Sequence, residues 1–326
     1  MQILVTGANG FLGSAILRAG QASGLGVVAG MRPGRAPATA GSDREVEIRE
    51  LELAPGPALV AALEGIDLVI HAAAAMSGDV AAQHAGTVKT TEALLAAMQT
   101  AGVRRLVGIS SFALYDYTAL QAGSTLDEAS PVESEPRRRD AYAQAKWHQE
   151  QLFRSFAEAG HAVAILRPGV IYGRDRLWPM CIGRSLGSGR LLRIGPPDAA
   201  VPMIHVDHCA QAIVQAAQRV DTLDGTQINL VDDPCPTRRG YIEAVNQHPA
   251  VSRQILPLPL GLLKCTGAVL TGLQATLGAP ARLPGLLRPV DLDASFKPLR
   301  YSNARARQQL DWSPAFTLAE AIARSV

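Results

Sequence analysis

Short runs of apolar residues alternate with longer segments of helical periodicity through the first half of the chain. Strands are predicted where Val, Ile and Leu follow one another, at 2–7, 26–31, 67–74, 104–111 and 161–169. Helices are predicted between them, at 13–24, 57–65 and 88–102, and again from about residue 141. Continuous apolar strands separated by helices are typical of a parallel sheet covered on both faces. The pattern predicts an α/β fold with a doubly wound parallel sheet, whose ligands bind beyond the carboxyl ends of the strands.

The alternation loosens after about residue 172, where Gly and Pro become frequent. We therefore predict a nucleotide-binding lobe over 1–172 and a smaller lobe, mainly for substrate, over 173–326. Within the second part, 203–218 has the pattern of a strand turning into a helix, and 203–232 is predicted to return to the first lobe. The apolar stretch 255–278 contains two prolines, four glycines and a lysine. It predicts a buried or surface-lying helix rather than a membrane span, with peripheral membrane contact left open.

Composition indicates an ordinary globular protein. Of 326 residues, 48% are hydrophobic, and 31 basic residues nearly balance 29 acidic ones to give a net charge of +2. The basic residues are scattered, so a nucleic-acid-binding surface is not expected. The four cysteines form no C-x-x-C pair or metal-ligand spacing, which favours buried thiols in a reducing cytoplasm and no metal site. The N-terminal residues lack the pattern of a secretory signal.

A glycine-rich turn follows the first predicted strand. Gly7, Gly10 and Gly13 lie at the start of the first helix, in the sequence TGANGFLG. The first glycine allows a tight turn, the second lets the backbone approach a pyrophosphate, and the third allows close helix–strand packing. Phosphates would meet free N–H groups at the helix N-terminus. The spacing is G-x-x-G-x-x-G rather than G-x-G-x-x-G, but its position predicts a dinucleotide site.

The end of the second strand bears on the choice of dinucleotide. An acid there usually accepts the ribose hydroxyls of NAD, whereas a basic residue suits the 2′-phosphate of NADP. The strand ends at Arg32, Arg35 follows, and no acid appears before Asp43. Because a guanidinium can hold a phosphate through two parallel hydrogen bonds, the sequence favours NADP(H) over NAD(H). A solvated arginine loop is the alternative.

Tyr142 and Lys146 are four residues apart in the segment DAYAQAK, which is predicted to be helical. They would share one helical face, either as a polar surface or as a reaction centre. Reduction of a carbonyl needs a proton donor to the forming alkoxide, and oxidation of an alcohol needs the reverse. A phenol with a pKa near 10 is a poor base, but a neighbouring ammonium lowers that pKa. We therefore expect Lys146 to tune Tyr142.

Taken in order, TGANGFLG, the strand ending ISS at Ser111, and YAQAK resemble the short-chain dehydrogenase/reductase superfamily, specifically its extended branch. That branch includes NAD(P)-dependent epimerases and dehydratases, dihydroflavonol reductases and 3β-hydroxysteroid dehydrogenases. EGIDLVIHAAA, LRPGVIYGR, MIHVDH and YSNARARQQLDWSPAFTLAEAIA resemble further segments of the same branch. The resemblance covers most of the chain and implies a Rossmann-type fold.

The resemblance also implies roles for individual residues. Tyr142 would be the general acid/base, Lys146 would also bond the nicotinamide ribose, and Ser111 would hydrogen-bond the reacting oxygen, with Ser110 as its rival on the opposite strand face. The implied cofactor contacts are Gly7, Asn9, Gly10, Phe11, Leu12, Gly13, Arg32, Arg35, Glu52, Leu53, Ala72, Ala73, Ala74, Tyr142, Lys146, Pro168, Gly169 and Val170. A homodimer through the two helices beside the serine strand is implied in the same way.

Three positions depart from the family pattern. Thr87 falls where the family has an Asn that helps to hold the active site, and Thr90 falls on the following Gly. Glu52 takes the place of the Asp that contacts adenine. These differences are compatible with an active enzyme.

Absent motifs narrow the reaction. The Asp-Glu pair of the dehydratases is replaced by Phe112 and Ala113, and the Asn and diphosphate-binding Arg of the nucleotide-sugar epimerases are missing. The expected substrate contacts are Phe112, Ala113, Leu177, Trp178, Met180 and His205. Asp207 is predicted to cap the following helix. Arg137, Arg138 and Arg139 form either a solvated loop, which is favoured, or a catch for an anionic substrate.

The sequence thus predicts an NADP-dependent oxidoreductase that transfers a hydride between the nicotinamide and a ketone or secondary alcohol. The substrate would be a moderately apolar small molecule. A sugar-nucleotide epimerase and a non-catalytic NADP-binding sensor or assembly protein are the alternatives, because fold alone does not separate them.

Overall fold

A seven-stranded parallel sheet forms the centre of the computed structural model, which describes residues 1–34, 46–187, 189–277 and 285–326. The strands lie in the order β3, β2, β1, β4, β5, β7, β12. Their bounds are β1 Gln2–Thr6, β2 Gly26–Met31, β3 Glu47–Glu50, β4 Leu68–His71, β5 Arg105–Ile109, β7 Ala162–Pro168 and β12 Gln227–Leu230. The order reverses between β1 and β4, which is where sheets of this kind form a binding crevice.

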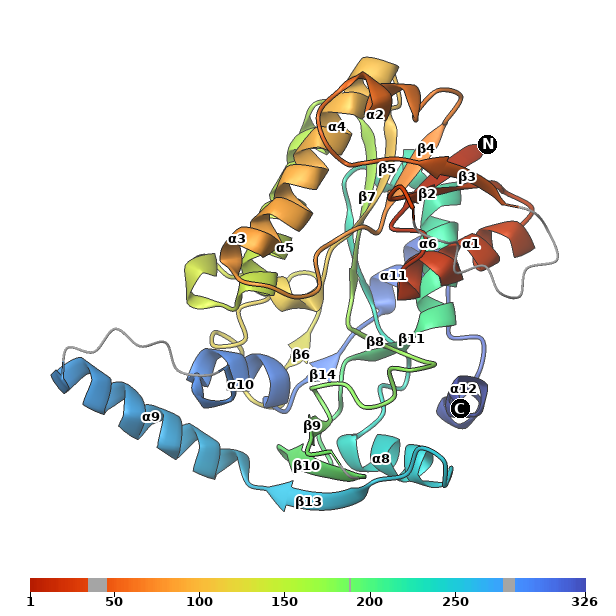
Figure 1. Cartoon of the computed structure of the whole chain (residues 1–326). Helices are drawn as coiled ribbons and strands as arrows, with labels where there is room; N and C mark the ends of the chain where they lie inside the picture. The colour runs from red at the N-terminus through yellow and green to blue at the C-terminus, as the bar shows by residue number, and fades with distance from the viewer. Residues whose placement is uncertain (35–45, 188, 278–284) are drawn as a thin grey trace.

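Helices cover both faces of this sheet (Figure 1). One face carries α1 (Phe11–Ala22), α6 (Val206–Gln218) and α11 (Ala304–Leu310); the other carries α2 (Pro57–Ala61), α4 (Thr90–Ala101) and α5 (Ala141–Glu158). Alternate side chains of β1 serve the two cores, since Ile3 and Val5 pack with the first helix layer and Leu4 with the second. The predicted doubly wound, Rossmann-type α/β fold is confirmed.

Two helix starts differ from the prediction. Helix α1 begins at Phe11 rather than residue 13, with Gly10 at the N-cap and no side-chain cap. Helix α4 begins at Thr90, and the six residues before it, His84–Lys89, form a π-helical turn. The hydroxyl groups of Thr90 and Thr91 both bond to the carbonyl of Thr87 in this turn. The local widening of the helix therefore falls where the sequence departs from the family pattern.

The chain leaves the central sheet after β7 and builds a second set of strands. β8 (Val170–Tyr172) pairs in parallel with β11 (Met203–His205), so that Tyr172 lies opposite His205. Asp232 joins the two ends, because its Oδ2 accepts hydrogen bonds from the Tyr172 hydroxyl (3.2 Å) and the His205 amide (3.0 Å). A three-stranded sheet of β9 (Gly183–Ser185), β10 (Arg190–Ile194) and β13 (Gln254–Leu258) lies beyond them. β12 rejoins the central sheet beside β7, while the lobe boundaries at 172 and 173 stay a prediction.

Helix α9 (Leu260–Leu277) extends away from the rest of the molecule (Figure 1). It packs closely at Gly267, where an added Cβ would lie 2.2 Å from the carbonyl oxygen of Leu287. Leu262, Val269 and Leu273 on this helix are exposed. Of the helices in the described ranges, none has the length and apolar character needed to cross a bilayer.

Shorter elements complete the described chain. The helices are α3 (Val80–Gln83), α7 (Val220–Leu223), α8 (Arg238–Asn246), α10 (Pro289–Phe296) and α12 (Leu318–Ser325). The 3₁₀ turns are η2 (Phe112–Leu114), η3 (Pro136–Arg138) and η4 (Gly285–Leu287), and β6 (Thr125–Leu126) pairs with β14 (Arg300–Tyr301).

Candidate active site

Helix α5 carries both residues that the sequence singled out for hydride chemistry. Asp140 caps its N-terminus, where Asp140 Oδ1 accepts a hydrogen bond of 2.9 Å from the amide of Ala143. The four-residue spacing then places Tyr142 and Lys146 one turn apart on the same face. Lys146 is buried and Tyr142 is half-buried. The cap therefore fixes where the helix begins, and with it the height of Tyr142 above the sheet.

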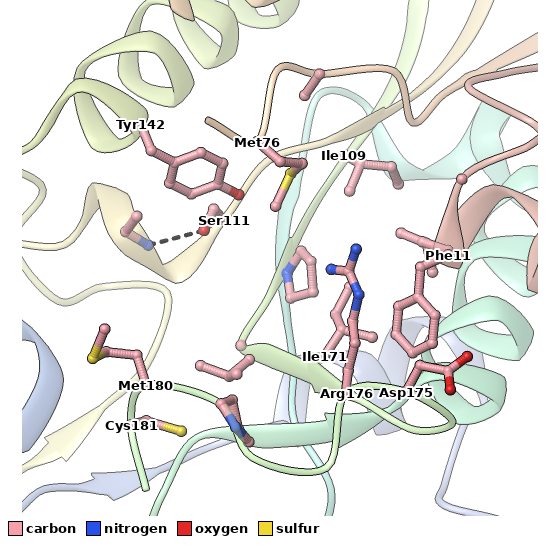
Figure 2. A pocket seen from close by; sticks show the side chains of 18 of the residues that line it. Phe11, Met76, Ile109, Ser111, Tyr142, Ile171, Asp175, Arg176, Met180 and Cys181 are labelled. Atoms are coloured by element: carbon pink, nitrogen blue, oxygen red, sulfur yellow. Dashed lines mark hydrogen bonds between the residues drawn. The ribbon is translucent and has the colours of Figure 1, made fainter. Parts of the chain in front are cut away.

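The hydroxyl of Tyr142 points toward Ser111, just beyond strand β5 (Figure 2). Ser111 Oγ accepts a hydrogen bond of 3.1 Å from the amide of Ala113. Burial raises the pKa of the Tyr142 phenol, the hydrogen bond with Ser111 lowers it, the charge of Asp140 raises it, and the net shift is upward. The phenol thus keeps its proton at neutral pH and can donate it to an oxygen placed between the two side chains.

Lys146 is held away from the solvent by two acceptors. Its Nζ donates to the carbonyl of Ile109 and to Oε1 of Gln149, each at 2.8 Å. Burial lowers the pKa of Lys146 to about 7, although the charge of Glu150 opposes the shift. Among the described residues, the causes of the Tyr142 shift are burial, Ser111 and Asp140. The expected net lowering of the Tyr142 pKa is therefore not found in this structure: burial of the phenol dominates, and the Lys146 amine bonds to Ile109 and Gln149 instead.

The glycine turn after β1 fits the diphosphate of a dinucleotide. Gly7 has a φ of +69°, and a Cβ there would lie 2.9 Å from Cα of Ala73. A Cβ on Gly13 would lie 2.1 Å from the carbonyl oxygen of Gly7, so that position accepts only glycine without a backbone shift. Because Gly10 lacks a capping side chain, the first amides of α1 stay open to an anion. The backbone here has the shape that the sequence predicted.

One cavity of about 1630 Å³ joins the glycine turn to Ser111 and Tyr142 and continues between the central sheet and the loops after β8. Figure 2 shows Phe11 and Arg176 on one side of it and Met180 and Cys181 on another. Arg176 lies over the ring of Phe11, with Cζ 4.7 Å from the ring centroid. The volume exceeds that of typical small-molecule sites, which is consistent with room for a cofactor and a substrate together.

The sequence profile described as the NAD dependent epimerase/dehydratase family matches residues 3–230. The chain belongs to that family. The matched range covers the glycine turn, Ser111, the Tyr142–Lys146 pair and the return to β12. The predicted resemblance to the extended short-chain dehydrogenase/reductase branch is confirmed, and the chain is assigned to a family of nicotinamide-dependent enzymes.

Family members with curated names differ in their chemistry. The chain is 28% identical over 63% of its length to N-acetyl-alpha-D-glucosaminyl-diphospho-ditrans,octacis-undecaprenol 4-epimerase of Escherichia coli O157:H7, and that match spans 62% of the relative. It is 25% identical over 97% of its length to 4-hydroxy-2-methyl-3-oxo-4-farnesyl-3,4-dihydroquinoline-1-oxide ketoreductase of Stigmatella aurantiaca, covering 93% of the relative. It is 31% identical over 65% of its length to 2-alkyl-3-oxoalkanoate reductase of Stenotrophomonas maltophilia, covering 64% of that protein.

Solved family structures share the fold. The UDP-N-acetylglucosamine 4-epimerase of Bacillus cereus superposes with a TM-score of 0.71 at 17% identity, covering 99% of this chain and 94% of that one. At this identity the similarity establishes the architecture of the sheet and its helices only.

Most of the predicted site residues line the cavity. They are Gly7, Asn9, Gly10, Phe11, Leu12, Gly13, Arg32, Leu53, Ala72, Ala73, Ala74, Ser111, Phe112, Ala113, Tyr142, Lys146, Pro168, Gly169, Val170, Leu177, Trp178 and Met180. The hydroxyl of Ser110 instead donates to Oε2 of buried Glu150 at 2.6 Å. Of the two serines, it is the Ser111 side chain that the structure brings to Tyr142.

Two predicted residues of the described ranges are not brought to the cavity. Glu52 is exposed, while Leu51 and Leu53 on either side of it line the wall, because alternate residues of an extended segment face opposite ways. His205 caps α6 instead of lining the cavity: its Nδ1 accepts from the amide of Asp207 at 3.2 Å, so Asp207 is not the cap. Arg35 lies outside the described residues.

A buried chain of hydrogen bonds leads from Lys146 to the glycine turn. Gln149 Nε2 donates to Thr91 Oγ1 (2.9 Å), Thr91 meets His71 Nε2 (2.9 Å), and His71 Nδ1 meets Thr6 Oγ1 (2.8 Å). Thr91 gives its own proton to the Thr87 carbonyl (2.6 Å), so it must accept from His71, which is then protonated on Nε2. Burial, with the charge of Lys146, lowers the pKa of His71 to about 3 and keeps it neutral.

Thr87, at the position of the family's Asn, contacts the loop after β4. Thr87 Oγ1 accepts from the amide of Ala75 at 3.0 Å and so holds the loop after β4, which borders the cavity. Gln149 supplies an oxygen to Lys146. Sequence reasoning missed Gln149 and Thr91. Gln149 could have been found from helical spacing, since it follows Lys146 by three residues on the same helix. Thr91 lies on another helix, and the local pattern gave no signal for it.

A second buried network lies behind Ser110. Arg167 donates to both oxygens of Glu150, at 2.9 Å from Nε and 2.5 Å from Nη2, and to the Tyr115 hydroxyl at 3.0 Å. Burial opposes ionisation of Glu150, but Arg167 outweighs it and holds the pKa of that carboxyl below its ordinary value. The pair joins α5 to β7, and it fixes the helix that carries Tyr142 and Lys146.

The side chains of His208 and Asp207 contact other groups, and Asp207 Oδ1 lies 3.6 Å from Arg18 Nη2. His208 Nε2 accepts from the amides of Ala315 (3.2 Å) and Phe316 (3.3 Å), and its Nδ1 meets Asp232 at 2.8 Å. Across the described ranges, no group of three or more His, Cys, Asp or Glu side chains is arranged to hold a metal ion.

Proposed function

We propose that this protein is an NADP-dependent oxidoreductase that transfers a hydride between the nicotinamide and a ketone or secondary alcohol of a moderately apolar substrate. The observation that carries the proposal is the Tyr142 hydroxyl facing Ser111 in a cavity continuous with the glycine turn. Leu177, Trp178 and Met180 give the far wall an apolar character. The ketoreductase and oxoalkanoate reductase relatives act, by their names, on oxo compounds that carry apolar chains.

The residues divide the work of the reaction. When bound, the nicotinamide supplies the hydride for reduction or accepts it for oxidation. Ser111 would hold the substrate oxygen, and Tyr142 would give its phenol proton to that oxygen as the new C–H bond forms, or take the proton back in oxidation. Lys146, when protonated, would stabilise the phenolate that remains after the proton transfer. The turn Gly7–Gly13 would bind the diphosphate.

The preference for NADP rests on the end of β2. No acid ends this strand, and Arg32 borders the cavity where the adenosine ribose would lie. Glu50 is a competing negative charge close by, because its Oε1 accepts from the amide of Gly34 at 3.2 Å. The wild type should bind NADPH at least about tenfold more tightly than NADH. Arg32→Ala should lose this preference, and titration of both proteins with both cofactors measures it.

Replacement of Tyr142 tests the reaction itself. Tyr142→Phe should lower kcat by roughly 10²-fold or more, since the proton donor is gone, while NADPH binding measured by fluorescence stays within about threefold. Near wild-type turnover in this variant, on any ketone that the wild type reduces, would refute the assignment.

Epimerisation is the second candidate, because relatives and structural neighbours are named as epimerases. It would use the same Tyr142 to oxidise and then re-reduce one carbon. Trapping of a keto intermediate, with no net consumption of NADPH over the reaction, would identify epimerisation. A non-catalytic NADP-binding sensor is the third, and cofactor binding without turnover over a broad ketone panel would support it.

Assembly and location stay predictions. A homodimer through α4 and α5 is testable by light scattering. Peripheral membrane contact of 255–278 finds support in the exposed Leu262, Val269 and Leu273 of α9, and vesicle sedimentation tests it. The cytoplasmic location is likewise an inference from the sequence.

A further inference from the structure

Three consecutive arginines before α5 have different surroundings. Arg137 and Arg138 lie in the turn η3 and are exposed, as expected for a solvated loop. Arg139 is only 4% exposed and lines the same cavity as Tyr142. One of the three is therefore directed inward, and the solvated-loop prediction does not hold for it.

The guanidinium of Arg139 is buried with few partners. Nη1 donates to the carbonyl of Tyr115 at 2.9 Å, and the ring of Tyr117 lies 5.7 Å from Cζ. Nε is buried and has no hydrogen-bond acceptor. In the ranges that the structure describes, no carboxylate forms an ion pair with Arg139. A buried cation without a counter-ion is costly, so its retention beside a cavity points to an anion that binds there.

Among the described residues, neither of the two nearby carboxylates makes a hydrogen bond to Arg139. Asp140 serves as the N-cap of α5 and accepts from Ala143. Asp291 Oδ2 lies 3.2 Å from Arg288 Nη1, but both of its carboxylate oxygens are buried without a hydrogen-bond partner. Burial, together with the charge of Asp140, raises the pKa of Asp291 despite the opposing charges of Arg288 and Arg139. Neither carboxylate therefore forms an ion pair with Arg139.

Arg139 is also close to the reacting centre along the chain. It precedes Tyr142 by three residues, and both side chains line the same cavity. Phe112, Ala113 and Ala294 give the neighbouring wall of the cavity a mainly apolar surface. An anion held by Arg139 would thus lie in the same cavity as an oxygen held by Ser111 and Tyr142, with an apolar chain continuing along the neighbouring wall.

We propose that Arg139 binds a carboxylate of the substrate, so that the substrate is an oxo acid or hydroxy acid with an apolar chain. A carboxylate matches the planar guanidinium, which has hydrogen-bond donors to spare beyond the one bond from Nη1 to Tyr115. This inference rests on the proposed function, which supplies the reacting carbonyl, and it adds the group by which the substrate is oriented.

The test compares a hydroxy acid with its uncharged ester. The full-length protein is assayed with NADP⁺ and either 3-hydroxyoctanoate or methyl 3-hydroxyoctanoate. We expect the wild type to favour the acid in kcat/KM by at least about tenfold. Arg139→Met, which keeps the length of the side chain, should lower kcat/KM for the acid by roughly thirtyfold or more and leave that for the ester within about threefold. Arg137→Met is the matched control and should behave as wild type.

A binding measurement keeps the inference separate from the proposed function. Octanoate should raise the Tm of the NADPH complex of the wild type and of Arg137→Met, and not that of Arg139→Met. Such protection without turnover of any alcohol would support the carboxylate site while the oxidoreductase assignment fails. Equal turnover of acid and ester by the wild type, with no protection by octanoate, would overturn the inference even if Arg139→Met fails to fold. Protection by uridine diphosphate instead of octanoate would also overturn it, by assigning the site to a diphosphate.

Discussion

The two halves of the cavity differ in how the chain builds them. The half toward the glycine turn consists of the ends of strands and helices, and behind it lie the Lys146–Gln149–Thr91–His71 chain and the Glu150–Arg167 pair, all buried. The half beyond β8 is built largely from loops, where Met180 is about half exposed. Stability and cofactor geometry are thus concentrated in one half, which leaves the other free to determine the substrate.

The largest expected effect comes from breaking the network behind the cofactor half. Glu150→Gln leaves Arg167 buried and charged without its carboxylate, so the free energy of unfolding should fall by about 3–5 kcal/mol. Urea denaturation measures it. Glu158→Gln, the same change at an exposed position of the same helix, should cost less than about 0.5 kcal/mol. An equal decrease in the free energy of unfolding in the two variants would show that the buried Glu150–Arg167 pair does not contribute more to stability than an exposed carboxylate.

A smaller effect concerns the pH dependence of stability. The pKa of Lys146 is about 7 in the folded protein, below its ordinary value of 10.5. Between these values the unfolded chain binds a proton that the folded protein does not, so the free energy of unfolding rises with pH. Relative to Lys146→Met, the wild type without cofactor should gain up to about 2 kcal/mol from pH 7 to pH 9. Lys89→Met, at an exposed lysine, should leave the dependence of the unfolding free energy on pH unchanged. If the difference in unfolding free energy between the wild type and Lys146→Met did not change with pH, the argument from burial of Lys146 would be contradicted.

The smallest effect on stability is expected in the substrate half. Met180 is 51% exposed, so Met180→Ala should change the free energy of unfolding by less than about 0.5 kcal/mol. It should nevertheless raise KM for long-chain substrates more than for short ones, since it removes apolar surface from the cavity wall. A loss of stability comparable to that of Glu150→Gln would end the distinction between the two halves.

The same division explains what the sequence could predict. Gly7, Gly10 and Gly13, and the pair Tyr142 and Lys146, act through local spacing on one turn and one helix, and both are visible in a linear pattern. The roles of His205 and Arg139 depend on contacts with distant segments: His205 bonds to Ser325, 120 positions away, and Arg139 to the Tyr115 carbonyl. The prediction for Glu52 was wrong because the face to which its side chain points depends on where β3 ends. Such facts arise from tertiary packing.

The pairing of β8 with β11 has a further consequence for engineering. Tyr172 and His205 lie side by side in the register, and Asp232 holds them both, so the thirty or so residues between them begin and end at one fixed point. Loops whose ends are fixed together tolerate changes of length and composition. Residues 173–202, taken together with β13, to which β10 is paired, thus form the unit to exchange; they carry Leu177, Trp178 and Met180, while Arg139 and Tyr142 stay in the recipient framework. Chimaeras made at this junction offer a route to altered specificity that leaves the catalytic helix untouched.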